Sequence, residues 1–323
     1  MSESIAGGGV QQSRPVRVAA IVPCLNEEAA VSKVVADLLA AVPGIEVYVY
    51  DNGSDDRTAE LALKAGARVR REGKRGKGNV VRRAFADVEA DVYLLVDGDD
   101  TYDIGDAPRM IQVLQDGPYD HVLGVRSQVS DTAYRAGHAS GNKFFNTLLG
   151  WTFRAEVSDM LSGYRVMSRR FVKSFPALSR HFEIETELTV HAVNARVPRA
   201  EVPVGFGDRG AGTESKLRTY HDGFRILGLF LRLLFRERPL LVWGMVAAVL
   251  ALAGLVLGLP VVFEYTNTGL VPRFPTAILA SGLMILSGVF FLMGVLLEAL
   301  ASLRNEVKRL HYLHNSAPQG RLQ

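Results

Sequence analysis

Two long apolar segments near the carboxyl terminus constrain this chain more than any other feature. Residues 240–263 and 276–297 contain no Asp, Glu, Lys or Arg. Each segment is long enough for a bilayer-spanning helix, which needs about 20 apolar residues. Buried helices of soluble proteins rarely run so far without a charge. We therefore expect two membrane-spanning helices joined by the short linker "EYTNTGLVPRFP".

Basic residues flank this pair of segments. Arg232, Arg236 and Arg238 precede the first, and Arg304, Lys308 and Arg309 follow the second. Because cytoplasmic flanks carry an excess of Lys and Arg, both ends of the hairpin are expected in the cytoplasm. The sequence thus predicts a multi-pass protein of the cell (inner) membrane, whose residues 1–238 form a cytoplasmic region.

Composition narrows the class of protein further. The 323 residues carry a formal net charge of only +3, so the charge does not indicate a nucleic-acid-binding protein. The single cysteine, Cys24, excludes an internal disulfide and suits a reducing compartment. Residues 1–15 lack an apolar core, so we expect a disordered tail there and not a secretory signal.

The region before the hairpin alternates short apolar runs with helical patterns. Strands are expected at 16–23, 45–51, 67–72 and 91–97, with helices at 26–42, 56–66 and 76–90 between them. This alternation predicts an α/β domain with a mainly parallel sheet. Three glutamates at 183, 185 and 187 fit one face of a further strand. We expect them to be a solvated charge run, with a role near a metal as the second possibility.

Polar clusters follow three of the expected strands, in Pro23–Glu27, Asp51–Gly53 and Asp97–Asp99. Ligands of open α/β sheets bind outside the carboxyl ends of the strands. The three clusters are therefore expected to form one site.

The run "LLVDGDDTYD" places Asp97 and Asp99 directly after a strand. Two carboxylates at i and i+2 can bind one hard cation such as Mg²⁺, with water and substrate phosphate as the other ligands. A solvated acidic turn is the alternative. A calcium loop is excluded, because Tyr102 and Pro108 stand where such a loop needs Gly and Glu.

A basic glycine-rich turn, "GKRGKGN", opens the helix that begins near residue 76. Such a turn at a helix amino terminus suits a phosphate group. It matches neither the Walker A spacing nor the G-x-G-x-x-G pattern. Taken by itself, this turn is interpreted as an ordinary basic loop.

Taken in order, these motifs resemble the family 2 glycosyltransferases of the GT-A fold. The resemblance rests on "IVPCLNEE", "VYDNGSDDRT", "RGKGNVVRRAF" and "LLVDGDDTYD". The later motifs "DMLSGYRVMSRR" and "GTESKLR", followed by two spans, are similar to the polyprenyl-phosphate glycosyltransferases, relatives of dolichyl-phosphate mannose synthase. The commoner pattern of the group reads D-A-D-L-Q where this chain has Asp97-Gly98-Asp99-Asp100-Thr101, which leaves the sugar and a third metal contact open.

The resemblance implies roles for individual residues. It assigns nucleotide-sugar binding to Pro23, Asn26, Glu27, Asp51, Gly53, Lys77 and Asp97. It assigns Mg²⁺ or Mn²⁺ to Asp97 and Asp99, and catalysis to Asp159 and Asp99. Ser215, Lys216 and Arg218 match the region that meets the acceptor phosphate, and Arg126, after a further strand, is a candidate for the same phosphate.

The expected activity is metal-dependent, inverting transfer of a hexose from a nucleotide-diphospho-sugar to a polyprenyl phosphate of undecaprenyl or dolichyl type. UDP-glucose and GDP-mannose are the candidate donors. A phosphate monoester has a second pKa of about 6, so the acceptor needs no strong base, and Asp159 is expected to act as an orienting group or a weak base. Transfer to another lipid, or a non-catalytic role in a membrane assembly, are the alternatives. A homo-oligomer is compatible with the sequence.

The chain accordingly divides into five parts. We expect a tail at 1–15, a glycosyltransferase domain at 16–215 and an amphipathic helix in the membrane interface at 216–238. The hairpin occupies 239–303 and a cytoplasmic tail 304–323. The aromatic-rich segment 141–153 is a second candidate for contact with lipid, with packing inside the domain as the equal alternative.

Overall fold

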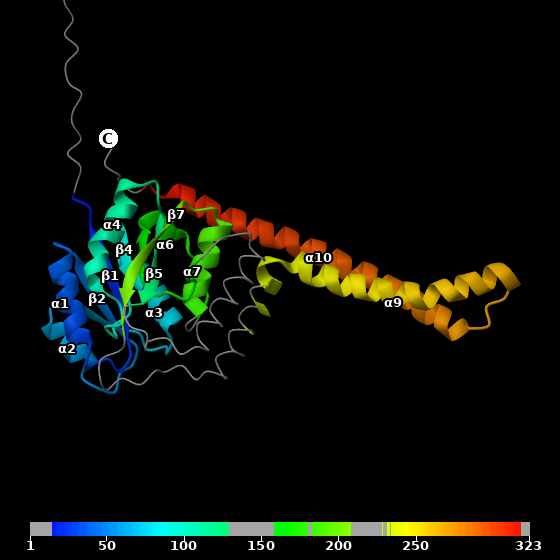
Figure 1. Ribbon diagram of the computed structural model, residues 1–323, viewed down its shortest axis with the longest axis horizontal. Helices are drawn as coiled ribbons and strands as arrows, with labels where there is room; N and C mark the ends of the chain where they lie inside the picture. Colours follow the sequence, from blue (N-terminus) through cyan, green and yellow to red (C-terminus); the bar gives the residue numbers. More distant parts are fainter. Residues whose placement is uncertain are drawn as a thin grey trace, which may run out of the picture.

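The computed structural model describes residues 15–128, 158–179, 183–207, 228, 231–232 and 234–317. It consists of an α/β domain and two long helices that project from it (Figure 1). Several expectations lie outside the described residues. These are the amino-terminal tail, the segment 141–153, the acceptor residues Ser215, Lys216 and Arg218, and most of the interfacial helix at 216–238.

A seven-stranded sheet forms the centre of the described part of the domain, in the order β3-β2-β1-β4-β6-β5-β7. The strands are β1 (Val18–Cys24), β2 (Glu46–Asp51), β3 (Arg68–Arg71), β4 (Val92–Leu95), β5 (His121–Gln128), β6 (Arg165–Ser168) and β7 (Arg199–Phe206). Only β6 runs antiparallel to its two neighbours, and the other described pairs are parallel. The prediction of a mainly parallel sheet is confirmed.

Helices cover both faces of this sheet (Figure 1). They are α1 (Val31–Ala41), α2 (Thr58–Lys64), α3 (Lys77–Asp87), η1 (Ile104–Asp106), α4 (Ala107–Asp116), α6 (Arg169–Ser174) and α7 (Glu183–Asn194). Alternate residues of β1 enter two separate buried clusters, because successive strand side chains point to opposite faces. Ala20 and Val22 pack with α1 and α4, whereas Ala19 and Ile21 pack with α3, α6 and α7.

The strand expected at the three glutamates is wrong. Residues 183–194 form the helix α7, in which Ile184 and Leu188 are fully buried one turn apart. The solvated charge run is wrong as well, because Glu185 and Glu187 are both buried. The alternation of polar and apolar residues in this segment fits a strand as well as a helix. Burial of two residues at positions i and i+4 is the pattern of a helix.

The two predicted apolar segments lie in α9 (Pro239–Thr268) and α10 (Phe274–His314), which run side by side. Both are long and apolar enough to cross a membrane, and most of their apolar surface is exposed. Small residues recur every seventh position between them, with Ala247 and Gly254 in α9 and Ala280, Ser287 and Gly294 in α10. The Ser287 hydroxyl donates a hydrogen bond to the carbonyl of Ala247 at 2.8 Å.

The second long helix extends beyond its predicted span. Residues after 303, expected to be a tail, continue α10 as a helix to His314. At about 1.5 Å per residue, its 41 residues measure about 60 Å, against a hydrocarbon core of about 30 Å. The carboxyl-terminal end of α10 lies against the α/β domain (Figure 1).

Candidate active site

The carboxyl ends of β1, β2 and β4 bring the three predicted polar clusters together. Cys24 lies opposite Asp51 in the register of β1 and β2, and Ile21 lies opposite Leu95 in that of β1 and β4. The Cys24 thiol is buried among these clusters. Its burial first, and then the negative charges of Glu27, Asp97, Asp51 and Asp99, raise the pKa of this thiol well above its ordinary value. Four predicted site carboxylates therefore surround one point at the sheet edge.

The loop after β1 is locked to the loop after β2 by hydrogen bonds. The backbone N–H of Asn26 donates to the Ser54 hydroxyl at 3.0 Å, and that of Asp55 donates to the Asn26 side chain at 2.9 Å. The N–H of Glu27 donates to the Thr58 hydroxyl at 2.8 Å. Asn26 has a φ of +53° and Gly53 one of +84°, conformations that Asn and Gly tolerate best.

Asn52 holds the basic turn against the sheet. Its side-chain amide donates to the carbonyls of Glu72 and Lys74 at 3.0 and 2.9 Å, and its side-chain oxygen accepts from the N–H of Gly76 at 2.6 Å. This turn leads directly into α3, whose first residue is Lys77. Asn52 belongs to the predicted polar cluster Asp51–Gly53, and its hydrogen bonds to the basic turn give it a structural role that the sequence did not indicate.

Lys77 is the centre of a buried charge cluster. Its ammonium pairs with the Asp97 carboxylate, and with Glu185 Oε1 of α7 at 2.5 Å. Burial would lower the pKa of Lys77, but Asp97 and Glu185 raise it well above its usual range. Burial also raises the pKa of Glu185, against the opposing effect of Lys77. Glu185, for which a role near a metal was only the second possibility, thus contacts the predicted nucleotide-binding residue Lys77.

The Ser162-Gly163-Tyr164-Arg165 run closes over this cluster. A Cβ atom on Gly163 would lie 2.5 Å from an Asp97 carboxylate oxygen and 3.0 Å from the Lys77 nitrogen, so a larger residue there would displace the Asp97–Lys77 pair. The N–H of Gly163 donates to the Tyr102 hydroxyl at 2.9 Å. Burial raises the pKa of Tyr102 to about 12, so this hydroxyl stays neutral at physiological pH.

Four carboxylates within a run of seven residues follow β4, and each has a protein partner. Asp97 pairs with Lys77, and Asp100 accepts from the Lys33 ammonium at 2.7 Å. Asp99 Oδ1 accepts from the Thr101 hydroxyl at 2.7 Å, and Asp103 caps the short helix η1 through the N–H of Gly105. Within the described residues, no group of three or more His, Cys, Asp or Glu side chains could hold a metal. Two carboxylate donors still fit Mg²⁺ or Mn²⁺, which fill their remaining positions with water and substrate phosphate.

Asp159 and Arg126 form a pair beside this cluster. Arg126 Nε and a terminal guanidinium nitrogen donate to the two carboxylate oxygens of Asp159 at 2.6 and 2.7 Å. The guanidinium also lies 5.3 Å from the ring centroid of Phe206. Arg126 was expected to meet a phosphate, and in the structure its guanidinium pairs with the predicted catalytic carboxylate of Asp159.

A fully buried arginine supports the turn that carries Asp159 and Gly163. Arg165 donates to the carbonyls of Ser162 and Met160 at 3.0 and 2.9 Å, and to the Thr189 hydroxyl of α7 at 2.9 Å. Burial lowers the pKa of Arg165 to about 10, so it remains charged at neutral pH. A charged fork with several carbonyl acceptors fixes the backbone of the turn.

Comparison with known proteins identifies the family. Residues 19–175 match the family described as Glycosyl transferase family 2. Glycosyltransferase AglJ of Haloferax volcanii is 33% identical over 303 residues, which cover 93% of this chain and 99% of that protein. The chain is a family 2 glycosyltransferase.

Two further proteins, a relative in sequence and a solved structure, are similar to this glycosyltransferase. The dolichyl-phosphate hexose transferase of Haloferax volcanii is 31% identical over 222 residues, 68% of this chain and 95% of that protein. Among solved structures, glucosyl-3-phosphoglycerate synthase from Mycobacterium tuberculosis, in complex with Mn²⁺, UDP and its product, superimposes with a TM-score of 0.54. That match covers 67% of this chain and 79% of the other at 22% identity, and it shows the shared GT-A fold.

As an enzyme of this family, the glycosyltransferase is not a non-catalytic subunit, which sets aside one alternative. The structure gathers Pro23, Asn26, Glu27, Asp51 and Gly53 at the same sheet edge as Lys77, Asp97 and Asp99. It adds Tyr102 and Arg165 to these residues, and it shows that Asn52 holds the turn before Lys77 and that Glu185 pairs with Lys77. The individual roles of all these residues stay predictions.

Proposed function

We propose that this glycosyltransferase transfers a hexose from a nucleotide-diphospho-sugar to a polyprenyl phosphate at the cytoplasmic face of the membrane. The observation that carries the proposal is the union, in one chain, of a carboxylate-rich site at a sheet edge with two exposed apolar helices. An enzyme whose acceptor is soluble in water would not need two such helices. The 31% identical relative named as a dolichyl-phosphate hexose transferase supports a lipid phosphate as the acceptor.

The donor is proposed to bind at the ends of β1, β2 and β4. Pro23, Asn26, Glu27, Asp51 and Gly53 would line the nucleotide pocket. Asp97 and Asp99 would hold Mg²⁺ or Mn²⁺, which neutralises the charge that develops on the leaving diphosphate. Lys77, held by two carboxylates, would add a fixed positive charge beside the same diphosphate. UDP-glucose and GDP-mannose are the two donors to test first.

The acceptor phosphate is proposed to approach from the side of Asp159. With a second pKa of about 6, the lipid phosphate is already a nucleophilic dianion in the cytoplasm. Asp159, gripped by Arg126 through both oxygens, is better suited to orient groups than to accept a proton. A single displacement at C1 inverts the anomeric centre. Ser215, Lys216 and Arg218 would meet the phosphate at the level of the lipid headgroups.

The hairpin α9–α10 is proposed to cross the inner membrane, with the domain at 16–215 and both termini in the cytoplasm. The segment 216–238 would lie in the interface, as the sequence predicts. The basic residues that flank the hairpin, among them Arg238 and Arg304, support this orientation by the positive-inside rule.

Purified full-length enzyme tests the proposal directly. It would be incubated with undecaprenyl phosphate and a panel of nucleotide sugars that includes UDP-glucose and GDP-mannose, and the lipid product would be identified by its mass. A glycosylated prenyl phosphate is the expected product. Transfer only to diacylglycerol, or only hydrolysis of the donor across the whole panel, would contradict it.

A further inference from the structure

The part of α10 beyond the bilayer is attached to the α/β domain along one face. Arg304, Lys308 and Tyr312 follow one another at intervals of four residues, so they share one side of the helix. Their neighbours Leu303, Leu310 and Leu313 are exposed. We call residues 298–314 of α10 the strut. Its length of about 25 Å is comparable with the width of a small domain.

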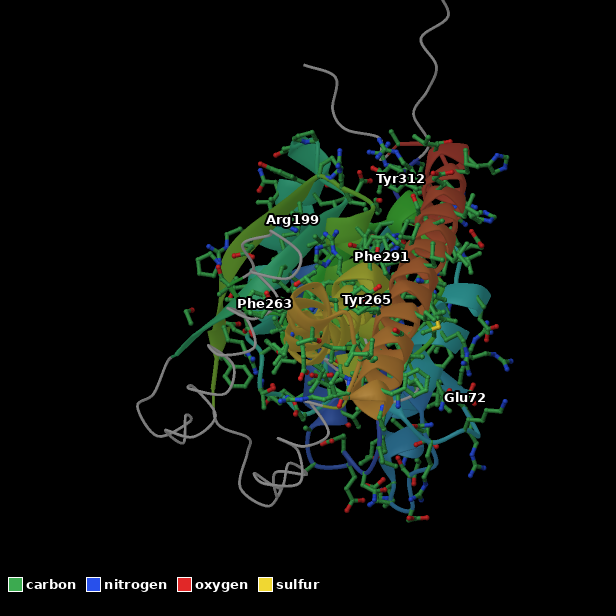
Figure 2. The ribbon with its side chains drawn as sticks, turned by 90° about the vertical axis from the view of Figure 1, so that its right-hand side faces the viewer. Glu72, Arg199, Phe263, Tyr265, Phe291 and Tyr312 are labelled. Atoms are coloured by element: carbon green, nitrogen blue, oxygen red, sulfur yellow. The ribbon has the colours of Figure 1, made fainter. Side chains whose placement is uncertain are left out.

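The far end of the strut is anchored by Tyr312. The tyrosine ring is buried among apolar residues of the domain, and its hydroxyl donates to Asp120 Oδ2 at 2.5 Å. The Arg170 guanidinium lies 4.7 Å from the ring centroid, at cation–π distance. Figure 2 shows Tyr312 near the domain end of α10, remote along the helix from Phe291.

Asp120 is the domain's half of this anchor. It is fully buried at the start of β5 and also accepts from Arg170 Nε and the Ser168 hydroxyl, both at 2.6 Å. Because two other donors hold this carboxylate, loss of the Tyr312 hydroxyl would not leave it without a partner. The anchor can therefore be removed from the helix side while the domain keeps its own contacts.

The near end of the strut has a second attachment. A terminal nitrogen of Arg304 donates to the carbonyl of Arg236 at 2.5 Å, just before α9 begins. Lys308 lies 4.0 Å from Glu237, whose other carboxylate oxygen accepts from Asn194 of α7 at 2.8 Å. One attachment point would let the domain pivot about the hairpin. Two attachment points on one rigid helix fix the orientation of the domain relative to that helix.

The anchor is linked to the site through a single short strand. β6 begins at Arg165, which holds the turn with Asp159, and ends at Ser168, which bonds Asp120. β6 is also paired along its whole length with β4, the strand that leads to Asp97. A displacement of the strut would thus act on β6, which follows the turn with Asp159 and pairs with β4, the strand before Asp97.

We infer that the strut sets the height and orientation of the active site above the bilayer, with Tyr312 and Asp120 as positioning residues for a membrane-bound acceptor. The inference rests on the proposed lipid phosphate acceptor. A phosphate on a long prenyl chain stays at the headgroup level, because each CH₂ withdrawn into water is unfavourable. The site must therefore be brought to it, whereas a short, water-soluble prenyl phosphate can diffuse to a site in any orientation.

The test compares two acceptors with the same full-length enzyme in proteoliposomes. These are bilayer-embedded undecaprenyl phosphate and dissolved citronellyl phosphate, each with the nucleotide sugar that the wild type uses. Tyr312→Ala is expected to slow transfer to undecaprenyl phosphate at least about tenfold, with transfer to citronellyl phosphate within about twofold of wild type. Tyr312→Phe keeps the ring under Arg170 and should lie between. Leu313→Ala, on the exposed side of the same turn, is the matched control and should change neither rate.

A direct readout accompanies the rates. A fluorophore on Leu63→Cys, at an exposed position of α2, would report the distance to acceptor-labelled lipid headgroups, since the native Cys24 is buried. Tyr312→Ala should broaden that distance distribution and Leu313→Ala should not. The proposed role of the strut would be wrong if Tyr312→Ala lost activity equally with both acceptors, or if it left the distance distribution unchanged. A wild type inactive toward both prenyl phosphates would instead overturn the proposed function, and the strut's role with it.

Discussion

Arg126 grips Asp159 through two parallel hydrogen bonds, at 2.6 and 2.7 Å. The two residues come from β5 and from the turn before β6, 33 positions apart. The fork geometry matches a carboxylate in a way that an ammonium does not. The residue predicted for catalysis and the residue predicted for phosphate binding are therefore one structural unit.

This unit predicts non-additive mutational effects. Arg126→Lys and Asp159→Asn should each lower kcat/KM at least about tenfold, since each breaks the fork that orients the other side chain. The double variant should lose little more than the worse single variant. Steady-state kinetics at saturating donor measures all three. Arg109→Lys, at an exposed Arg–Asp pair, is the control that should stay near wild type. Full additivity would show that the two residues act independently.

A second prediction concerns the carboxylates after β4. Asp97→Asn and Asp99→Asn should each reduce transfer at least about 100-fold, because each removes a hard oxygen donor for the divalent ion. EDTA should have the same effect on the wild type, and added Mn²⁺ or Mg²⁺ should reverse it. Circular dichroism should show an intact fold. Asp116→Asn, at an exposed aspartate at the end of α4, controls for loss of charge. Wild-type activity in metal-free buffer would refute the assignment.

Local patterns were enough to predict the sheet and the edge at which the site lies. Hydrophobic periodicity and turn residues are properties of neighbouring positions, so the strands ending at Cys24, Asp51 and Leu95 could be located within a few residues. The clustering of Glu27, Asp51 and Asp97 followed from the parallel arrangement of those strands. Both spans were predicted from length and charge alone.

The remaining features depend on residues that are distant in sequence. Glu185 is buried because Lys77, on another helix, supplies its counter-charge, and no local pattern indicates such a partner. Tyr312 is buried because Asp120 lies 192 positions away in the chain and beside it in the fold. The charged residues around it, such as Arg309, gave the end of α10 the appearance of a solvated tail.

The Lys77 cluster gives a third prediction. Lys77→Met should destabilise the protein by about 3–5 kcal/mol, because it leaves the buried Glu185 and the partly buried Asp97 as like charges without a cation. Adding Glu185→Leu to that variant should recover part of the loss. Lys33→Met, at an exposed pair, should cost less than about 1 kcal/mol. Urea unfolding in detergent measures each value.

The same cluster also predicts a pH dependence. Because the folded pKa of Lys77 is raised above its ordinary 10.5, its stabilisation should be constant through neutral pH and be lost only as pH rises through the folded pKa. Urea unfolding at pH 8 and 9 checks this. The prediction would be wrong if the free energy of unfolding of the wild type fell between these two pH values and that of Lys77→Met did not.

Two buried histidines predict acid sensitivity. The rings of His121 and His191 both lie next to that of Phe171, and burial lowers the pKa of His191 to about 3 and that of His121 well below its usual value. The unfolded chain binds protons on both below about pH 6.5 and the folded protein does not. Stability should therefore fall as pH drops from 6.5, by about 1.4 kcal/mol per histidine at pH 5.5. Urea unfolding at pH 7.5 and 5.5 measures this, and His191→Gln should halve the fall while His314→Gln leaves it unchanged.

Close approach of α9 and α10 depends on individual glycines. A Cβ atom on Gly294 would lie 3.1 Å from Cβ of Trp243 and 3.4 Å from a methyl group of Leu240. Gly288, less than two turns away on the same helix, has no heavy atom within 4 Å of its Cβ position. One glycine therefore faces the neighbouring helix and the other faces outward.

These two glycines give a matched pair of substitutions. Gly294→Leu must push α9 away, and overpacking of this kind costs about 1–3 kcal/mol. Gly288→Leu adds the same side chain where lipid would surround it, and it also removes a poor helix former, so it should be neutral or stabilising. Thermal unfolding in detergent should show a lower Tm for Gly294→Leu alone. Because helices pack in membranes through small residues and not through apolar burial, the difference should persist in lipid nanodiscs. Equal Tm values for both variants would mean that α9 and α10 do not pack through Gly294.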